Sequence, residues 1–387
     1  MQVKNLKSLF DNHKETRLFH RYICNDHVLT LIKELSNKFE VSTIGHSVKG
    51  EEIHAIKFGT GSKRILLWSQ MHGNESTTTK ALFDLLNTLS ANDDLFNSVG
   101  TSCTITIIPI LNPDGARAYT RVNANEVDLN RDAQDLTQPE SRILKSVYDD
   151  FMPHYCFNLH GQRTIFGVGA TNKSATVSFL APSEDEERSI TDTRKKAMEI
   201  ISFLNTILQN QIPGQVGIYD DSFNINCVGD TFQSLGSVTV LFEAGHFKDD
   251  YSRETTRFFI YQSLLLAIDY IFNNTISGEG FEPYLNIPNN EKSFFDIIIR
   301  NASVFKDEKF EIVDIGIQYK EILSEGNVLF VPKIEKIERL NGFYGHRELD
   351  AKEHKVLTND FQPIYLNYEN DFVFINNEKY SLKLINT

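Results

Sequence analysis

The sequence has few cysteines, no long apolar run and a deficit of positive charge. Its four cysteines stand far apart with no Cys-x-x-Cys pair, so we expect no disulfide framework, no cysteine zinc site and four small buried side chains. The 39 lysines and arginines against 52 aspartates and glutamates give a net charge of −13, which argues against a nucleic-acid binder. No apolar stretch approaches the ~20 residues of a membrane span, and the first residues lack the apolar segment of a secretory signal. We therefore expect a cytoplasmic protein with no membrane partner.

Short apolar runs alternate with amphipathic segments over the first 270 residues or so. Runs of strand length occur at 64–70, 104–111, 154–160 and 238–242, and helical periodicity occurs at 27–35, 82–89, 184–209 and 252–272. Strands that alternate with helices predict an α/β layer fold.

The pattern of apolar and polar residues changes after residues 275–290, which are rich in Gly, Pro and Asn. Beyond them lie β-prone runs at 294–301, 309–319, 327–334, 362–368 and 371–385, the last with a hairpin turn at Asn376 and Asn377. We expect an N-terminal helical segment (1–40) that packs on a catalytic domain (41–276), followed by a small β-rich domain (290–387) of unknown role.

Polar residues follow several of the predicted strands, where ligands bind in open α/β sheets. His72 and Glu75 lie three apart on a turn that leads into a helix, and His160 follows a later strand. Each alone suggests a structural residue, such as a capping Glu. Together they form a two-His, one-carboxylate set of the kind that binds zinc and leaves a position open for water. Glu243 ends another apolar run, where a carboxylate has no evident structural purpose, and is the candidate general base.

The segment 112–134 is polar and contains three of the chain's arginines among several asparagines. It could be a solvated loop. Alternatively, Arg131 could clamp a carboxylate with Asn130 beside it, and Arg121 could stabilise an oxyanion. The density of polar residues does not decide between these readings.

Five motifs occur in an order that resembles the zinc carboxypeptidases of the carboxypeptidase A (M14) superfamily. They are HGNE at 72–75, NPDG at 112–115, RVNANEVDLNR at 121–131, LHG at 159–161 and FEAG at 242–245. The resemblance covers roughly residues 40–273. It implies a twisted mixed sheet of about eight strands flanked by helices, in agreement with the alternation read above.

The resemblance also implies a role for each candidate residue. His72, Glu75 and His160 would bind one Zn²⁺ per chain, Glu243 would be the catalytic base, Arg121 would polarise the carbonyl, and Asn130 and Arg131 would hold the terminal carboxylate. The implied activity is that of a metallocarboxypeptidase, which hydrolyses the C-terminal peptide bond of a peptide with a free C-terminus through a zinc-bound water activated by Glu243. Tyr219, 24 residues before Glu243, fits the mobile tyrosine of the family loosely.

The sequence departs from the family at several positions. Gly161 follows His160 where many relatives have serine, and Arg163 adds a positive charge nearby. Arg117 also follows NPDG, but Arg121 opens the run that relatives share. The residues around Cys227 carry no charge apart from Asp230, so we expect a neutral or apolar terminal residue in the substrate.

Two other functions remain open at this stage. The desuccinylase and aspartoacylase group also resembles HGNE and DLNR, so the substrate could be an N-acyl amino acid, although NPDG favours the peptidase. The pocket could also bind a peptide terminus without cutting it, but every expected ligand and Glu243 are present. The sequence leaves the oligomeric state unknown.

Overall fold

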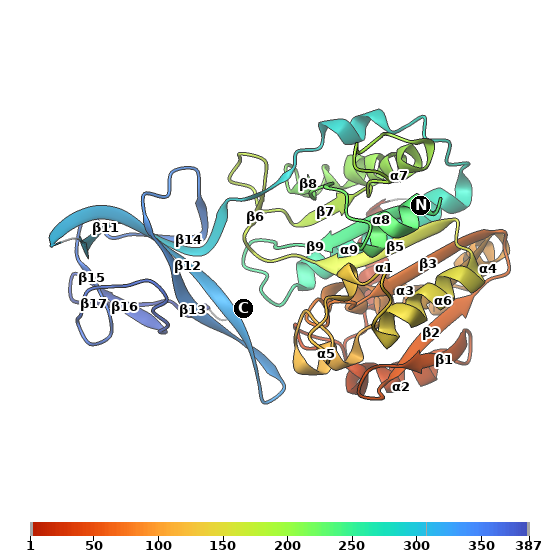
Figure 1. Ribbon diagram of the computed structural model, residues 1–387, viewed down its shortest axis with the longest axis horizontal. Helices are drawn as coiled ribbons and strands as arrows, with labels where there is room; N and C mark the ends of the chain where they lie inside the picture. The colour runs from red at the N-terminus through yellow and green to blue at the C-terminus, as the bar shows by residue number, and fades with distance from the viewer. Residues whose placement is uncertain (1–2, 307, 385–387) are drawn as a thin grey trace.

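The computed structural model describes residues 3–306 and 308–384, and its centre is an eight-stranded mixed sheet (Figure 1). The strands lie in the order β1 (Glu40–His46), β2 (Glu52–Phe58), β4 (Cys103–Ile108), β3 (Lys63–Ser69), β5 (Tyr155–Gly161), β9 (Val238–Ala244), β7 (Val177–Leu180) and β8 (Val216–Ile218). The neighbours β4, β3, β5 and β9 run parallel, and the pairs β1–β2, β2–β4 and β7–β9 are antiparallel. The mixed sheet of about eight strands is therefore confirmed.

Helices cover both faces of this sheet. They are α1 (Val3–His13), α2 (Asn25–Leu35), α3 (Thr77–Ala91), α4 (Asp93–Ser102), α5 (Pro113–Ala118), α6 (Pro139–Phe151), α7 (Asp192–Leu208), α8 (Val228–Ser234) and α9 (Glu254–Asn273), with short 3₁₀ turns at Leu129–Arg131 and Glu282–Asn286. None of the helices within residues 3–306 and 308–384 has the length and apolar character to cross a membrane.

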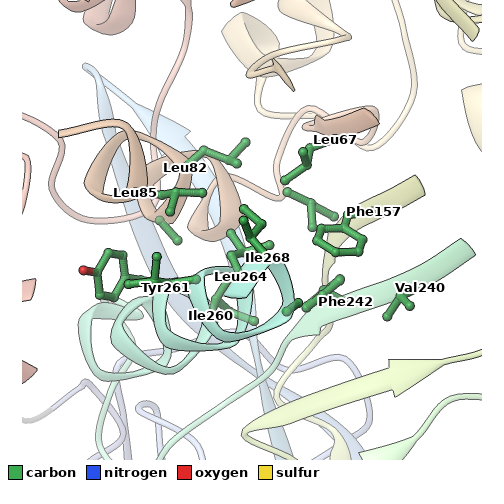
Figure 2. Close-up of a cluster of buried hydrophobic side chains, with 14 of the residues drawn as sticks. Leu67, Leu82, Leu85, Phe157, Val240, Phe242, Ile260, Tyr261, Leu264 and Ile268 are labelled. Atoms are coloured by element: carbon green, nitrogen blue, oxygen red, sulfur yellow. The ribbon is translucent and has the colours of Figure 1, made fainter. Parts of the chain in front are cut away.

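Successive side chains of a strand point to opposite faces, and β3 shows why the sheet needs helices on both. Leu67 joins the larger core cluster, whereas Leu66 and Trp68 join a second cluster together with residues of α6 and α8. Figure 2 shows the larger cluster, in which α3 and α9 pack on β3, β5 and β9 through residues such as Leu82 and Leu264. Because both faces are buried, the central strands read as continuous apolar runs.

The chain beyond residue 290 forms a separate β-rich region, as predicted (Figure 1). A four-stranded sheet contains β13 (Asn327–Glu338), β12 (Lys309–Ser324), β11 (Phe294–Lys306) and β14 (Tyr344–Asp350), and a three-stranded sheet contains β15 (Val356–Leu357), β16 (Phe372–Ile375) and β17 (Glu378–Ser381). The hairpin turn between β16 and β17 lies at Asn376 and Asn377, both with positive φ. The short β10 (Asn290–Lys292) leaves this region and pairs with β6 (Phe166–Val168).

Polar contacts join the β-rich region to the rest of the molecule. Arg21 forms an ion pair with Glu321 at 3.1 Å, and Tyr119 donates a hydrogen bond to the same carboxylate. Gln318 donates to Thr164 Oγ1 at 2.6 Å. The expected division of the chain into segments 1–40, 41–276 and 290–387 stays a prediction. Each of these contacts joins residues of two different segments.

Three local predictions were wrong. The helix expected at 184–209 begins at Asp192, because Asp185 accepts a hydrogen bond from the Ser189 N–H and Thr191 caps the helix by accepting from the Arg194 N–H. The run 362–368 forms no strand. Among the four cysteines, all free thiols, Cys227 is only half-buried.

Candidate metal and substrate site

The candidate residues meet at the carboxyl ends of three parallel strands. His160 and Glu243 are register partners on β5 and β9. His72 lies three residues beyond the end of β3, which is the other neighbour of β5. The edge of the sheet therefore brings together residues that lie up to 171 positions apart in the sequence.

Three side chains converge as metal ligands. His72 Nδ1 lies 3.0 Å from Glu75 Oε1, His160 Nδ1 lies 3.0 Å from Glu75 Oε2, and the two Nδ1 atoms are 3.1 Å apart. They are the one group of three or more potential ligands found among the described residues. Ligand atoms that each lie about 2 Å from one ion are separated by about this distance, so the set fits a single zinc ion.

Electrostatics favour the charged carboxylate at Glu75. Burial alone would raise the pKa of Glu75, but the neighbouring His72 and His160 outweigh burial and hold this pKa well below its usual range. The Gly161 N–H also donates to Glu75 Oε2 at 2.9 Å. This backbone contact holds the carboxylate in place from the position where many relatives have serine.

Asp128 belongs to the site although the sequence analysis gave it no role. Its Oδ1 lies 3.0 Å from His72 Nε2, and its Oδ2 accepts a hydrogen bond from Arg121 Nε at 3.0 Å. A proton on His72 Nε2 that is shared with Asp128 leaves Nδ1 free for a metal. The aspartate of the DLNR motif, two residues before Asn130, was the available signal.

The loop that carries His72 and Glu75 is fixed by the NPDG turn. Asn112 caps α5 by accepting a hydrogen bond from the Gly115 N–H at 2.8 Å, and Pro113 takes the first helical position. Gly73 lies so close to this turn that a Cβ there would be 2.0 Å from the Gly115 carbonyl carbon. The glycines of two separate motifs therefore allow one close contact between backbones.

Glu243 is buried beside the ligands, and its Oε2 has no hydrogen-bond partner among the described residues. Burial raises the pKa of Glu243 well above its usual value, and the negative charge of Glu75 adds to this shift. An unpartnered buried carboxylate costs stability, which is expected where the group has a chemical role.

The structure distinguishes the two arginines that follow NPDG. Arg121 lies at the site, with Nη1 3.4 Å from Glu75 Oε1 in addition to its bond to Asp128. Arg117 instead pairs with Asp26 and Glu51 at the surface. The preference for Arg121 agrees with this arrangement.

A cavity of about 570 Å³ adjoins the ligands. The cavity is lined by all eight candidate residues, His72, Glu75, Arg121, Asn130, Arg131, His160, Tyr219 and Glu243. Asn130 Oδ1 accepts a hydrogen bond from the Val228 N–H at 2.9 Å, and Arg131 donates to the Asn130 carbonyl at 2.7 Å. These bonds hold the predicted clamp on the cavity wall.

Tyr219 directly follows the short strand β8. Its ring lies 5.5 Å from that of Phe166, and burial raises the pKa of its hydroxyl to about 12. The phenol is therefore neutral at physiological pH and could donate a hydrogen bond into the cavity.

Comparisons with known proteins agree with this geometry. Residues 26–165 match the family model described as zinc carboxypeptidase. Carboxypeptidase 2 of Trichophyton rubrum is 31% identical over 101 residues, which are 26% of this chain and 19% of the fungal protein. Over these matched segments the chain is similar to zinc carboxypeptidases. Carboxypeptidase SOL1 of Arabidopsis thaliana is 28% identical over 211 residues, or 47% of this chain and 43% of the plant protein. The matched segments thus span less than half of either relative.

Two solved structures of similar fold are carboxypeptidases by name. The putative carboxypeptidase A from Shewanella denitrificans gives a TM-score of 0.54 at 19% identity, covering 64% of this chain and 69% of that one. Carboxypeptidase A from Helicoverpa armigera gives 0.51 at 15% identity, covering 69% of this chain and 80% of that one. At these identities the likeness concerns the fold.

Three other residues near the family motifs take no part in the site. His154 Nδ1 accepts a hydrogen bond from the Arg64 N–H at 3.1 Å, and Cys156 is buried on the face of the sheet covered by α6 and α8. The ring of His246 packs 4.3 Å from that of His346. None of the three lines the cavity.

Proposed function

We propose that this chain is a zinc-dependent metallocarboxypeptidase that removes the C-terminal residue of peptides. The observation that carries the proposal is the convergence of His72, Glu75 and His160 in one cavity with Glu243 and the Asn130–Arg131 pair. A binding protein without catalysis would not need a buried, unpartnered carboxylate beside a metal site.

His72, Glu75 and His160 would hold the ion, and zinc there would polarise the scissile carbonyl and lower the pKa of a water toward ~7. Glu243 takes a proton from the attacking water as its oxygen bonds to the carbonyl carbon. Glu243 then gives this proton to the leaving amine as the carbon–nitrogen bond breaks. Arg121 donates to the carbonyl oxygen as negative charge develops there, a contribution of about 3–4 kcal/mol in comparable sites.

Arg131 and Asn130 hold the free carboxylate of the substrate and so set which peptide bond reaches Glu243. A planar guanidinium can bind both carboxylate oxygens, which fixes orientation as well as position. A C-terminal amide lacks the negative charge and would bind poorly. A cytoplasmic location stays part of the proposal.

The test is mass spectrometry of zinc-supplemented protein incubated with mixed peptides, their C-terminally amidated twins and N-acyl amino acids, with and without chelator. We expect loss of single residues from free termini only, abolished by the chelator. Cleavage of N-acyl amino acids with no action on peptides would instead favour the deacylase. Zinc binding without any hydrolysis would favour a peptide-binding role.

A further inference from the structure

Two of the four arginines and lysines that line the cavity have no partner among the described residues. Arg121 bonds to Asp128 and Glu75, and Arg131 donates to the Asn130 carbonyl. The side chains of Arg163 and Lys292 form no ion pair or hydrogen bond with any residue in 3–306 or 308–384, and both residues are exposed. In a chain with a net charge of −13, two free cations on one cavity mark a local site for an anion.

Three of the four acidic residues of the same cavity, all except the buried Glu243, are engaged elsewhere. Glu75 contacts both histidines. Asp230 is buried and accepts from the Asn224 N–H at 2.8 Å, whereas Asp220 accepts from the N–H and hydroxyl of Ser222. None of them forms an ion pair with the two free cations.

A second cavity shows on which side of the metal ligands Arg163 lies. This cavity, of about 340 Å³, shares Glu75, Arg121 and Gly161–Arg163 with the first and is also lined by Tyr319–Glu321 of β12. Asn130 and Arg131 line only the first cavity. The two cavities meet at Arg163, so a peptide held at its terminus by Arg131 and extended past the metal ligands would reach Arg163 as it enters the second cavity.

The two free cations are held on fixed backbone. The loop of Arg163 is anchored at Thr164, which accepts hydrogen bonds from Gln318 at 2.6 Å and from His346 Nε2 at 2.8 Å. Lys292 lies on β10, and its register partner on β6 is Phe166. Phe166 follows Arg163 by three residues in the sequence. The β-rich region thus supplies one cation and anchors the loop of the other, so little ordering of the backbone is needed when an anion binds.

We propose that Arg163 and Lys292 form a subsite for a carboxylate on the residue before the scissile bond, so that the preferred substrates are peptides with an acidic penultimate residue. The direction of the peptide rests on the proposed function. The neutral or apolar terminal residue expected from the sequence is compatible with this subsite, because Leu180, Pro182 and Leu241 also line the first cavity.

The test compares binding of acetyl-Ala-Ala-Glu-Ala and acetyl-Ala-Ala-Gln-Ala by calorimetry to the zinc-supplemented Glu243→Gln protein, which should not consume them. We expect the Glu peptide to bind about tenfold more tightly. In the same background, Arg163→Ala and Lys292→Ala should each lower this ratio about threefold, and the double variant should abolish it. Lys173→Ala, an exposed lysine on the loop after β6 that does not line the cavity, should retain the full ratio.

Equal or undetectable binding of the two peptides would overturn the subsite, as would a preference that survives in the double variant. Acetyl-Ala-Ala-Ala-Glu checks the position, since a preference for this peptide would move the anion to the terminal residue and also contradict the proposal. Cleavage by the wild-type protein is a separate readout. Equal cleavage of both peptides would support the carboxypeptidase function and reject the subsite. Preferential binding of the Glu peptide without cleavage would support the subsite and reject the carboxypeptidase function.

Discussion

Glu243 and the ligands make different contacts, so their variants should fail in different ways. Glu243→Gln keeps the shape of the side chain but cannot take a proton, so we expect zinc content to be retained and kcat to fall by about 10²–10⁴-fold. His72→Ala removes a ligand and should lose both zinc and turnover. Metal analysis and peptide hydrolysis measure the two properties, with the exposed Glu187→Gln as control. A fully active Glu243→Gln protein would refute the assignment of the base.

A variant of Asp128 tests whether zinc binding depends on the orientation of His72 as well as on its presence. Asp128→Asn can no longer serve as a charged acceptor for His72 Nε2–H, so we expect zinc affinity to fall about 10–100-fold. Competition with a chelator of known affinity measures the change. Asp135→Asn, on an exposed part of the same loop, should bind zinc like the wild type.

The sequence predicted the ligands and the base because His160 and Glu243 end apolar runs, His72 and Glu75 lie on the polar turn after another, and the five ordered motifs resemble the zinc carboxypeptidases. Asp128 was missed because its role comes from contacts with His72 and Arg121, which lie 56 and 7 residues away. The free cations at Arg163 and Lys292 could not be predicted as a pair, since β10 and β6 meet only in the folded chain.

At the scale of elements, the metal loop depends on its fit against α5. Gly73→Ala would place a methyl group 2.0 Å from the Gly115 carbonyl carbon and 2.2 Å from the Ala116 nitrogen. These are backbone atoms, so the loop must move. We expect a loss of about 1–3 kcal/mol in the free energy of unfolding, as for other overpacked sites, together with weaker zinc binding.

Urea denaturation and a chelator titration of Gly73→Ala check both effects. Gly100→Ala in α4 is the matched control, because the nearest atom to its Cβ would be 3.4 Å away and alanine favours a helix. A Gly73→Ala protein as stable as Gly100→Ala would show that the loop at 72–75 and the turn at 112–115 can move apart at no cost in stability.

Element prediction succeeded where apolar periodicity was strong and failed where local polar contacts decided. The runs that became β3, β5 and β9 are buried on both faces and were recognised. β1 carries mostly exposed and half-buried residues and was missed, since nothing in its sequence marks a buried face. The run 362–368 has the composition of a strand, but Phe361 and Asn367 adopt positive φ and turn the chain at both ends.

At the scale of the whole molecule, the buried His246 and the half-buried His346 lie where the β-rich region meets the eight-stranded sheet. His246 follows β9, His346 lies on β14, and neither ring nitrogen of His246 has a partner among the described residues. Burial lowers the pKa of His246 well below its usual value, and the nearby His346 and Arg253 lower it further. Burial also lowers the pKa of His346, against the opposing effect of Asp296.

The unfolded chain therefore binds protons at these two sites at a pH where the folded chain does not. As the pH falls below about 6.5, the free energy of unfolding should fall by up to about 1.4 kcal/mol per pH unit for each histidine. Urea denaturation between pH 7.5 and 5.5, with chelator so that zinc does not contribute, measures this slope. His246→Leu should reduce the slope, whereas His354→Leu at the surface should leave it unchanged.

The pairing of β10 with β6 bears on attempts to produce the part of the chain before the β-rich region alone. A fragment that ends at residue 276 would leave β6 with unpaired backbone N–H and C=O groups along one edge. Such an edge is a template for pairing with a strand of another molecule, so the fragment should self-associate and be difficult to purify as a monomer. Insolubility of that fragment would then reflect a missing neighbour strand and would carry no information about the fold of the eight-stranded sheet itself.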